Sequence, residues 1–211
     1  MAVSGLVLVA YLITHVLANL LVFDGPDRIN RYAALLHGTG LALWGARLVL
    51  LFAVTVHIVA AVQLTLRSRA ARPQPYAAGR EAQATTIAAR TIRWGGALIL
   101  LFLVYHILHF TTGQAHHDFR APVETAGGLR HFAYHNVTSA FEIGWVVLLY
   151  VVAMVFLGMH LFHGLWSMFQ SLGWNHPRFN RWRNAFAVVF ALVVSLGFIL
   201  VPVAVWAGLI G

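Results

Sequence analysis

The chain contains no cysteine and no lysine. Without cysteine it cannot form disulfides, thiolate metal sites or iron–sulfur clusters, and it cannot attach a c-type haem covalently. The basic residues are therefore all arginine, 14 in number, against 6 carboxylates. No nucleic-acid motif accompanies this basic balance, so we interpret the charge as membrane topology and partner docking.

Charge is also scarce, because only 9% of the residues are charged while 60% are hydrophobic, and the mean hydropathy is +0.78. Ordinary soluble domains contain about 25% charged residues. A soluble globular enzyme is therefore excluded, since too little charge is present to cover a surface that faces water. Disorder is excluded too, because disordered chains are poor in apolar and aromatic residues.

What is abundant is long apolar sequence. Each of five stretches reaches the ~20 residues that cross a hydrocarbon core, and they cover residues 3–23, 41–66, 92–112, 141–172 and 184–209. Alternating strand patterns are absent, so helices must satisfy the backbone in lipid. The sequence predicts an all-α integral membrane protein, with residues 1–211 as one transmembrane domain of five helices.

The arginines are distributed unevenly between the connections. The second and fourth loops hold eight arginines and the first and third hold four. The positive-inside rule then places the arginine-rich side in the cytoplasm. We therefore expect a multi-pass protein of the bacterial inner membrane, with the N-terminus cytoplasmic and the C-terminus outside.

Histidines lie within four of the five predicted helices. His15, His57, His106 and His160 each occupy a different one of the first four. At ~1.5 Å per residue, His15 and His106 lie roughly 13 and 10 Å from the outer boundary, whereas His57 lies roughly 15 Å from the cytoplasmic boundary. His160 is grouped with His57 toward the inside.

Ionisable residues inside a membrane indicate function. Two facing histidine pairs at two depths are what two stacked bis-histidine b haems require, because neutral imidazole is an axial iron ligand. We therefore expect the first four helices to bundle around two haems. Ala18, Ala60, Ala61, Gly158 and Gly164 either let the flat macrocycles approach the backbone or serve helix packing.

The same residues carry a resemblance over nearly the whole chain. Segments 158–177 (GMHLFHGLWSMFQSLGWNHP), 12–23 (LITHVLANLLVF), 56–64 (VHIVAAVQL), 67–76 (RSRAARPQPY) and 105–113 (YHILHFTTG) carry it. They resemble the single-chain, two-haem cytochrome b membrane anchors of succinate:quinone oxidoreductases and quinol:fumarate reductases. Some fumarate-reducing relatives have a glutamate two residues before the fourth-helix ligand, where this chain has Gly158.

The resemblance implies a function as well as ligands. It assigns His15 and His106 to the distal haem b and His57 and His160 to the proximal haem b. It implies a flavoprotein subunit with FAD and an iron–sulfur subunit as partners, since this chain has no dinucleotide motif and no cysteine. The chain would then be the non-flavin anchor of succinate dehydrogenase, a respiratory complex II. Electrons would pass through the proximal and then the distal haem to a quinone, usually menaquinone, near the outer face. A higher oligomer of the complex is left open.

Further residues are candidates for quinone and propionate binding. Quinone carbonyls need donors and a proton exit, for which the outer-end candidates are Glu142, His109, Asp24, Asp27, Arg28 and Arg31. Glu142 is the first choice because it is the only carboxylate within the five stretches. The alternative is that Glu142 is simply a negative charge at the start of a helix, where it interacts favourably with the helix dipole. Propionates prefer arginine, and the candidates are Arg47, Arg90, Arg93 and His163. The loop histidines, His116, His117, His131 and His135, are expected to be solvated.

Four alternatives stay open. The complex can run in reverse as a quinol:fumarate reductase. A cytochrome b of the quinol:cytochrome c oxidoreductase type would need two ligands about fourteen residues apart on one helix, and no helix here has that spacing. A transporter with metal- or proton-binding histidines is disfavoured by the few intramembrane carboxylates. The last alternative is a haem-free anchor.

Overall fold

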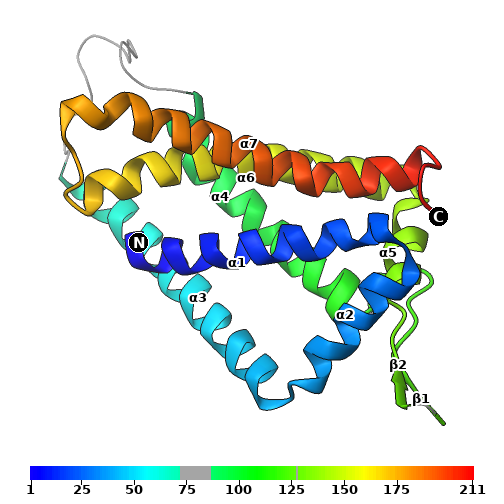
Figure 1. The fold of residues 1–211 in the computed structure, drawn as a ribbon. Coiled ribbons are helices and arrows are strands. Elements are labelled where there is room, and N and C mark those ends of the chain that lie inside the picture. Colours follow the sequence, from blue (N-terminus) through cyan, green and yellow to red (C-terminus); the bar gives the residue numbers. More distant parts are fainter. Residues whose placement is uncertain (72–86, 127) are drawn as a thin grey trace.

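The computed structural model describes residues 1–71, 87–126 and 128–211 (Figure 1). Among them, five helices are long and apolar enough to cross a membrane, so the chain is an all-α, multi-pass membrane protein as predicted. The five are α1 (Ala2–Leu20, extended by a 3-10 turn over Leu21–Asp24), α3 (Leu41–Ala70), α4 (Ile87–His106, extended by a π-helical turn over Ile107–Thr111), α6 (Gly144–Ser171) and α7 (Asn180–Trp206, preceded by a 3-10 turn over Pro177–Phe179).

Two predicted loops contain secondary structure that we did not expect. The first contains helix α2 (Pro26–Gly38). The third contains strands β1 (Val123–Thr125) and β2 (Gly128–Arg130), an antiparallel pair, and helix α5 (Ala133–Phe141). These elements lie together at one end of the bundle, which we call the cap end (Figure 1). Short amphipathic helices lack the long apolar run that made the spans visible in the sequence.

The five spanning helices are packed unequally. The pair α6 and α7 runs side by side and forms the most extensive helix contact, α4 packs on α6, and α1 packs on α3 and α7 (Figure 1). The most apolar windows of α6 and α7 are 33% and 39% buried, whereas those of α1, α3 and α4 are 6–11% buried. Neither α1 with α4 nor α3 with α6 is a closely packed pair in the described residues.

Gly158 explains the close approach of α6 and α7. A Cβ at this position would lie 2.7 Å from Ser195 Oγ and 3.4 Å from Ser195 Cβ of α7. In lipid, small residues allow helix backbones to approach because packing rather than hydrophobicity drives association. Gly158 therefore serves helix packing. By contrast, nothing lies within 4 Å of a Cβ at Gly164.

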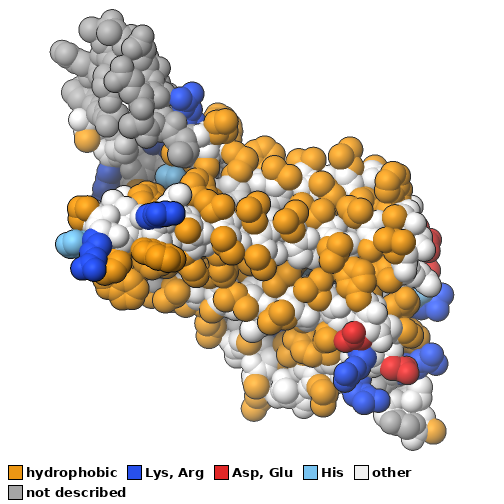
Figure 2. Space-filling view, turned by 45° about the horizontal axis from the view of Figure 1, so that its top comes forward, with side chains coloured by type: hydrophobic (Ala, Val, Ile, Leu, Met, Phe, Trp, Pro, Cys, Tyr) orange, Lys and Arg blue, Asp and Glu red, His pale blue; other side chains and the backbone are white. Residues whose placement is uncertain are grey.

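Charge divides the bundle by its ends. Every carboxylate in the described residues belongs to the cap end, and these are Asp24, Asp27, Asp118, Glu124 and Glu142. The opposite end, the arginine end, comprises the C-terminal end of α3, the start of α4 and the connection between α6 and α7. Figure 2 shows apolar side chains over the body, arginines at both ends and acidic side chains at one end only. Arg72 and Arg80 of the predicted second loop lie outside the described residues, as do positions 72–76 of the resembling segment.

We expect Gly158→Leu to destabilise the protein by about 1–3 kcal/mol, because the larger side chain overpacks the contact with Ser195. Unfolding of the detergent-solubilised chain in increasing sodium dodecyl sulfate measures the change. Gly164→Leu is the matched control on the same helix and should be nearly neutral. Equal losses from the two substitutions would contradict the packing role.

Candidate functional site

The four histidines predicted as ligands meet in two pairs. The rings of His15 on α1 and His106 on α4 have their centroids 5.8 Å apart, and those of His57 on α3 and His160 on α6 are 6.1 Å apart. These are the same two pairs that the depth estimates grouped together. Each pair joins two helices that do not pack closely against one another.

Two glycines show how the pairs are arranged along the bundle. Gly5 of α1 lies against His57, and a Cβ added to Gly5 would be 3.6 Å from the imidazole ring. Gly96 of α4 lies against His160, and a Cβ added there would be 3.8 Å from that ring. His15 and His106 each follow these glycines by ten residues. Ten residues of helix span about 15 Å, so both helices independently place the two pairs roughly 15 Å apart along the bundle axis.

The separation within each pair suits a shared metal ion. A bond between a metal ion and an imidazole nitrogen is about 2 Å long, so two rings on opposite sides of one ion have centroids roughly 6 Å apart. The observed 5.8 and 6.1 Å agree with that arrangement. The residues present therefore fit a bis-histidine haem iron in each pair.

Three of the four histidines have a polar side chain beside Nδ1. Ser4 Oγ lies 3.3 Å from His57 Nδ1, Tyr150 OH lies 3.3 Å from His106 Nδ1, and Asn19 Nδ2 lies 3.5 Å from His15 Nδ1. Metal-binding histidines usually donate the second ring N–H to an acceptor, which the hydroxyls of Ser4 and Tyr150 can provide. The amide nitrogen of Asn19 is a donor, so in this arrangement His15 Nδ1 accepts from it. Ser4 Oγ donates to Met1 O at 3.0 Å, so its oxygen can accept from His57 Nδ1–H and leave Nε2 with the free lone pair.

His160 differs from the other three. Its Nδ1 is buried and has no hydrogen-bond partner in the described residues. A buried polar atom without a partner costs about 1–3 kcal/mol.

Tyr150 connects His106 to the fully buried His109. Its hydroxyl lies 2.9 Å from His109 Nδ1 as well as 3.3 Å from His106 Nδ1. The π-helical turn, with Thr112 N donating to Ile107 O, changes the helix rotation directly after His106. If the phenol donates to His109 at the shorter distance, its oxygen accepts from His106 Nδ1–H. Single π turns of this kind occur frequently at functional sites.

The quinone candidates are not gathered into one site. His109 is 1% exposed and is covered by Tyr105, Phe110, His116 and Tyr150. The others are exposed, and no hydrogen bond or ion pair joins any two of them in the described residues; they are Asp24, Asp27, Arg28, Arg31 and Glu142. The placement of Glu142 inside the fourth helix was wrong, because α6 begins at Gly144 and Glu142 is the C-cap of α5.

The propionate candidates occupy both ends. Arg47 is half-buried in the first turns of α3 and stacks over Trp44 at 4.9 Å, close enough to Tyr11 of α1 to act on it electrostatically. Tyr11 in turn stacks on His15. Arg90 and Arg93 are exposed on the first turns of α4. His163 Nε2 lies 3.3 Å from Ser167 Oγ of its own helix.

Two of the four loop histidines are buried, so the expectation that all four are solvated was wrong. His116 is 8% and His131 is 5% exposed. His116 Nε2 donates to Asn136 O at 2.7 Å, and burial lowers the pKa of His116. The His131 ring lies tilted against that of His37 of α2, with centroids 4.7 Å apart, and burial, followed by the charge of His37, lowers the pKa of His131. The cause is the cap end, whose α2 and α5 cover what appeared to be loop.

Sequence reasoning missed the residues that hold the ligand candidates in place, namely Ser4, Gly5, Asn19, Gly96 and Tyr150. Only Asn19 carries a local signal, since it follows His15 by one helical turn and faces it. The others belong to helices far from their partners in the sequence.

Comparisons with known proteins return no match from the protein-family models, the curated proteins or the solved structures.

We expect acid to destabilise the cap end through His131. Its folded pKa is lowered, so the unfolded chain binds the proton more tightly, and stability is full above the unfolded value of about 6.5 and falls as pH decreases. Thermal unfolding of the detergent-solubilised chain from pH 8 to 5.5 tests this. His131→Gln should flatten the acid decline, whereas the exposed His117→Gln should keep it. An unchanged decline in His131→Gln would contradict the assignment.

Proposed function

We propose that this chain is the cytochrome b membrane anchor of a succinate:quinone oxidoreductase. The proposal rests on one observation, the two facing histidine pairs. Their ring centroids are 5.8 and 6.1 Å apart, and the pairs lie at two different levels along α1 and α4. The resemblance of the segments around all four histidines to that family supports it. Two b haems would be held by His15 with His106 and by His57 with His160.

The chain's own residues would prepare these ligands. Ser4 and Tyr150 can accept from Nδ1–H of His57 and His106, which would raise ligand basicity and direct Nε2 toward the iron. The bound haems would supply reversible one-electron transfer between the two ends of the bundle.

The two ends would have different tasks. The arginine end suits the cytoplasm by the positive-inside rule, and there the iron–sulfur subunit, itself bound to the FAD-carrying flavoprotein, would dock and deliver electrons. The quinone, menaquinone for this type of anchor, would react at the cap end. That end supplies carboxylates and histidines for proton exchange, and Tyr150 and His109 extend the polar groups inward to His106. The protein would lie in a bacterial inner membrane with its N-terminus in the cytoplasm.

Two other functions remain as competing hypotheses. The same site serves a quinol:fumarate reductase if electrons flow from the cap end to the arginine end. A histidine-based metal or proton transporter is less favoured, because the described carboxylates lie at the cap end rather than beside the histidine pairs.

A dithionite-reduced minus oxidised spectrum of the purified chain, with a pyridine haemochrome assay, should show about two b haems per chain. A flavoprotein and an iron–sulfur protein should co-purify with the chain from a native membrane extract. A chain that is intact and free of haem would refute the proposal, and a bound divalent metal in its place would favour the transporter.

The haems can be removed separately. His57→Ala and His160→Ala should each abolish the haem at the arginine end and leave one b haem, because both rings belong to one pair. His15→Ala and His106→Ala should abolish the other haem. His163→Ala is the control, since its ring lies one turn from His160 and bonds to Ser167 instead. Loss of different haems from His57→Ala and His160→Ala would refute the pairing.

We expect Tyr150→Phe to raise the midpoint potential of the haem at the His15–His106 pair. Losing the acceptor for His106 Nδ1–H makes the ligand less basic, and a hydrogen bond of about 1 kcal/mol corresponds to roughly 40 mV for one electron. Potentiometric titration followed by optical spectra measures both haems. Tyr105→Phe is the matched control, because its buried hydroxyl has no partner in the described residues. A shift confined to the other haem would contradict the role.

A further inference from the structure

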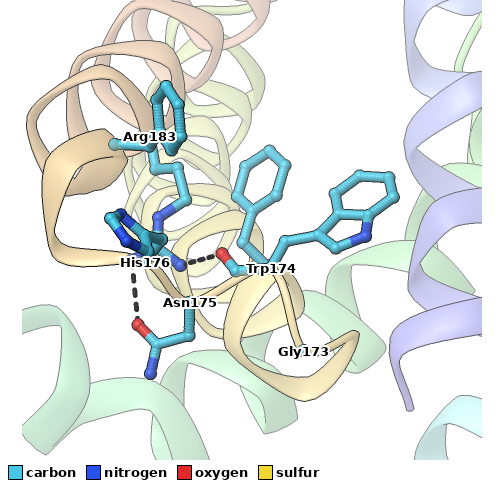
Figure 3. A pocket seen from close by; sticks show the side chains of 7 residues that line it. Gly173, Trp174, Asn175, His176 and Arg183 are labelled. Atoms are coloured by element: carbon cyan, nitrogen blue, oxygen red, sulfur yellow. Dashed lines mark hydrogen bonds between the residues drawn. The ribbon is translucent and has the colours of Figure 1, made fainter.

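The connection between α6 and α7 forms a pocket at the arginine end. Its volume is about 520 Å³, and it is lined by Phe169, Gly173, Trp174, Asn175, His176, Phe179 and Arg183 (Figure 3). It lies where α6 ends at Ser171 and the next apolar span begins at Pro177. The pocket therefore lies at the level where the hydrocarbon core meets water and is far from the histidine pair at the cap end.

Arg183 is a buried cation that forms no ion pair within the described residues, and its guanidinium lies 5.0 Å from the centre of the Trp166 ring. It is 6% exposed, and its guanidinium donates to Trp174 O, to Asn175 Oδ1 at 3.0 Å and to Asn180 Oδ1, as Figure 3 shows for the first two. All three acceptors are neutral, and its Nε has no partner in the described residues. Burial of an uncompensated charge is costly, so an anion in this pocket would be stabilised.

Other groups around the pocket also favour an anion. His176 Nδ1 accepts from Arg178 N at 3.2 Å, so the neutral ring carries its hydrogen on Nε2 and can donate. Arg178 is exposed on the connection and Arg181 on the first turn of α7, and the described residues of this end include no carboxylate. Arginine, amide and imidazole donors around one pocket match the oxygens of a phosphate group.

The surroundings indicate the source of the phosphate. Trp174 and Phe179 are 65% and 54% exposed at the rim, as aromatic residues are at membrane interfaces. Along α7, the exposed Phe186 and Val189 continue an apolar path away from the pocket. We propose that this pocket binds the phosphate of an anionic membrane phospholipid, whose acyl chains lie along α7. The proposal is independent of haem binding, and basic pockets at cytoplasmic helix ends are known to suit such lipids.

Thermal unfolding of the full chain in a neutral detergent tests the proposal. Added phosphatidylglycerol should raise the unfolding midpoint by at least about 3 °C at saturation. Phosphatidylcholine and inorganic phosphate at the same concentrations should raise it by less than half as much. An equal shift from inorganic phosphate would assign the pocket to a free anion and overturn the lipid proposal.

Two substitutions and a control locate the effect. Asn175→Asp places a carboxylate against Arg183 in the position of the present acceptor. The hydrogen bonds of the connection between α6 and α7 are then kept, while the pocket no longer attracts an anion. The phosphatidylglycerol shift should disappear, with the lipid-free midpoint unchanged or raised. Arg183→Gln should also abolish the shift but lower the lipid-free midpoint, because it removes the hydrogen bonds that Arg183 makes to the connection between α6 and α7.

Arg181→Gln is the matched control, since it removes one positive charge from an exposed residue that is two positions from Phe179 and outside the pocket lining. It should retain most of the shift. An equal loss in Arg181→Gln and Asn175→Asp would show only general charge attraction, and an intact shift in Asn175→Asp would show that the lipid binds elsewhere. Either result overturns the proposal.

Discussion

The close packing of α6 against α7 is the contact on which the other features depend. Gly158 allows it, because a side chain there would collide with Ser195. The pair buries more of its surface than the other spanning helices do, and α4 and α1 are attached to it. Helix α7 contains no histidine, yet it supports α6, which carries both His160 and Tyr150. The helix without ligands thus determines where two of the site's central side chains lie.

The facing histidine pairs use the looser part of the bundle. Each pair spans two helices that do not pack closely, so contact between them is made by rings rather than by backbones. Neutral imidazoles in an apolar interior are stable only when their nitrogens are satisfied. Ser4 and Tyr150 can satisfy Nδ1 of His57 and His106, and metal ligation would use the other nitrogen of each ring.

The two ends of the bundle stabilise their buried polar side chains in different ways. At the cap end, α2, α5 and the hairpin enclose His116 and His131, which are held by Asn136 O and His37 as neutral rings. At the arginine end, Arg183 cannot become neutral, so its hydrogen bonds leave a net charge. A titratable ring adapts to burial by losing a proton, whereas a guanidinium keeps its charge.

The sequence by itself determined the number of spanning helices and the spacing of the histidines along them. Both follow from local quantities, since bilayer thickness sets the length of an apolar run and helical rise converts residue numbers into distance along the helix. It did not determine what those histidines contact, which way Gly158 faces, or that His116 and His131 are buried. These features depend on how each helix rotates about its axis and on how the short cap-end elements fold back. Helices that are apolar around their circumference do not encode that rotation, so only tertiary packing decided it.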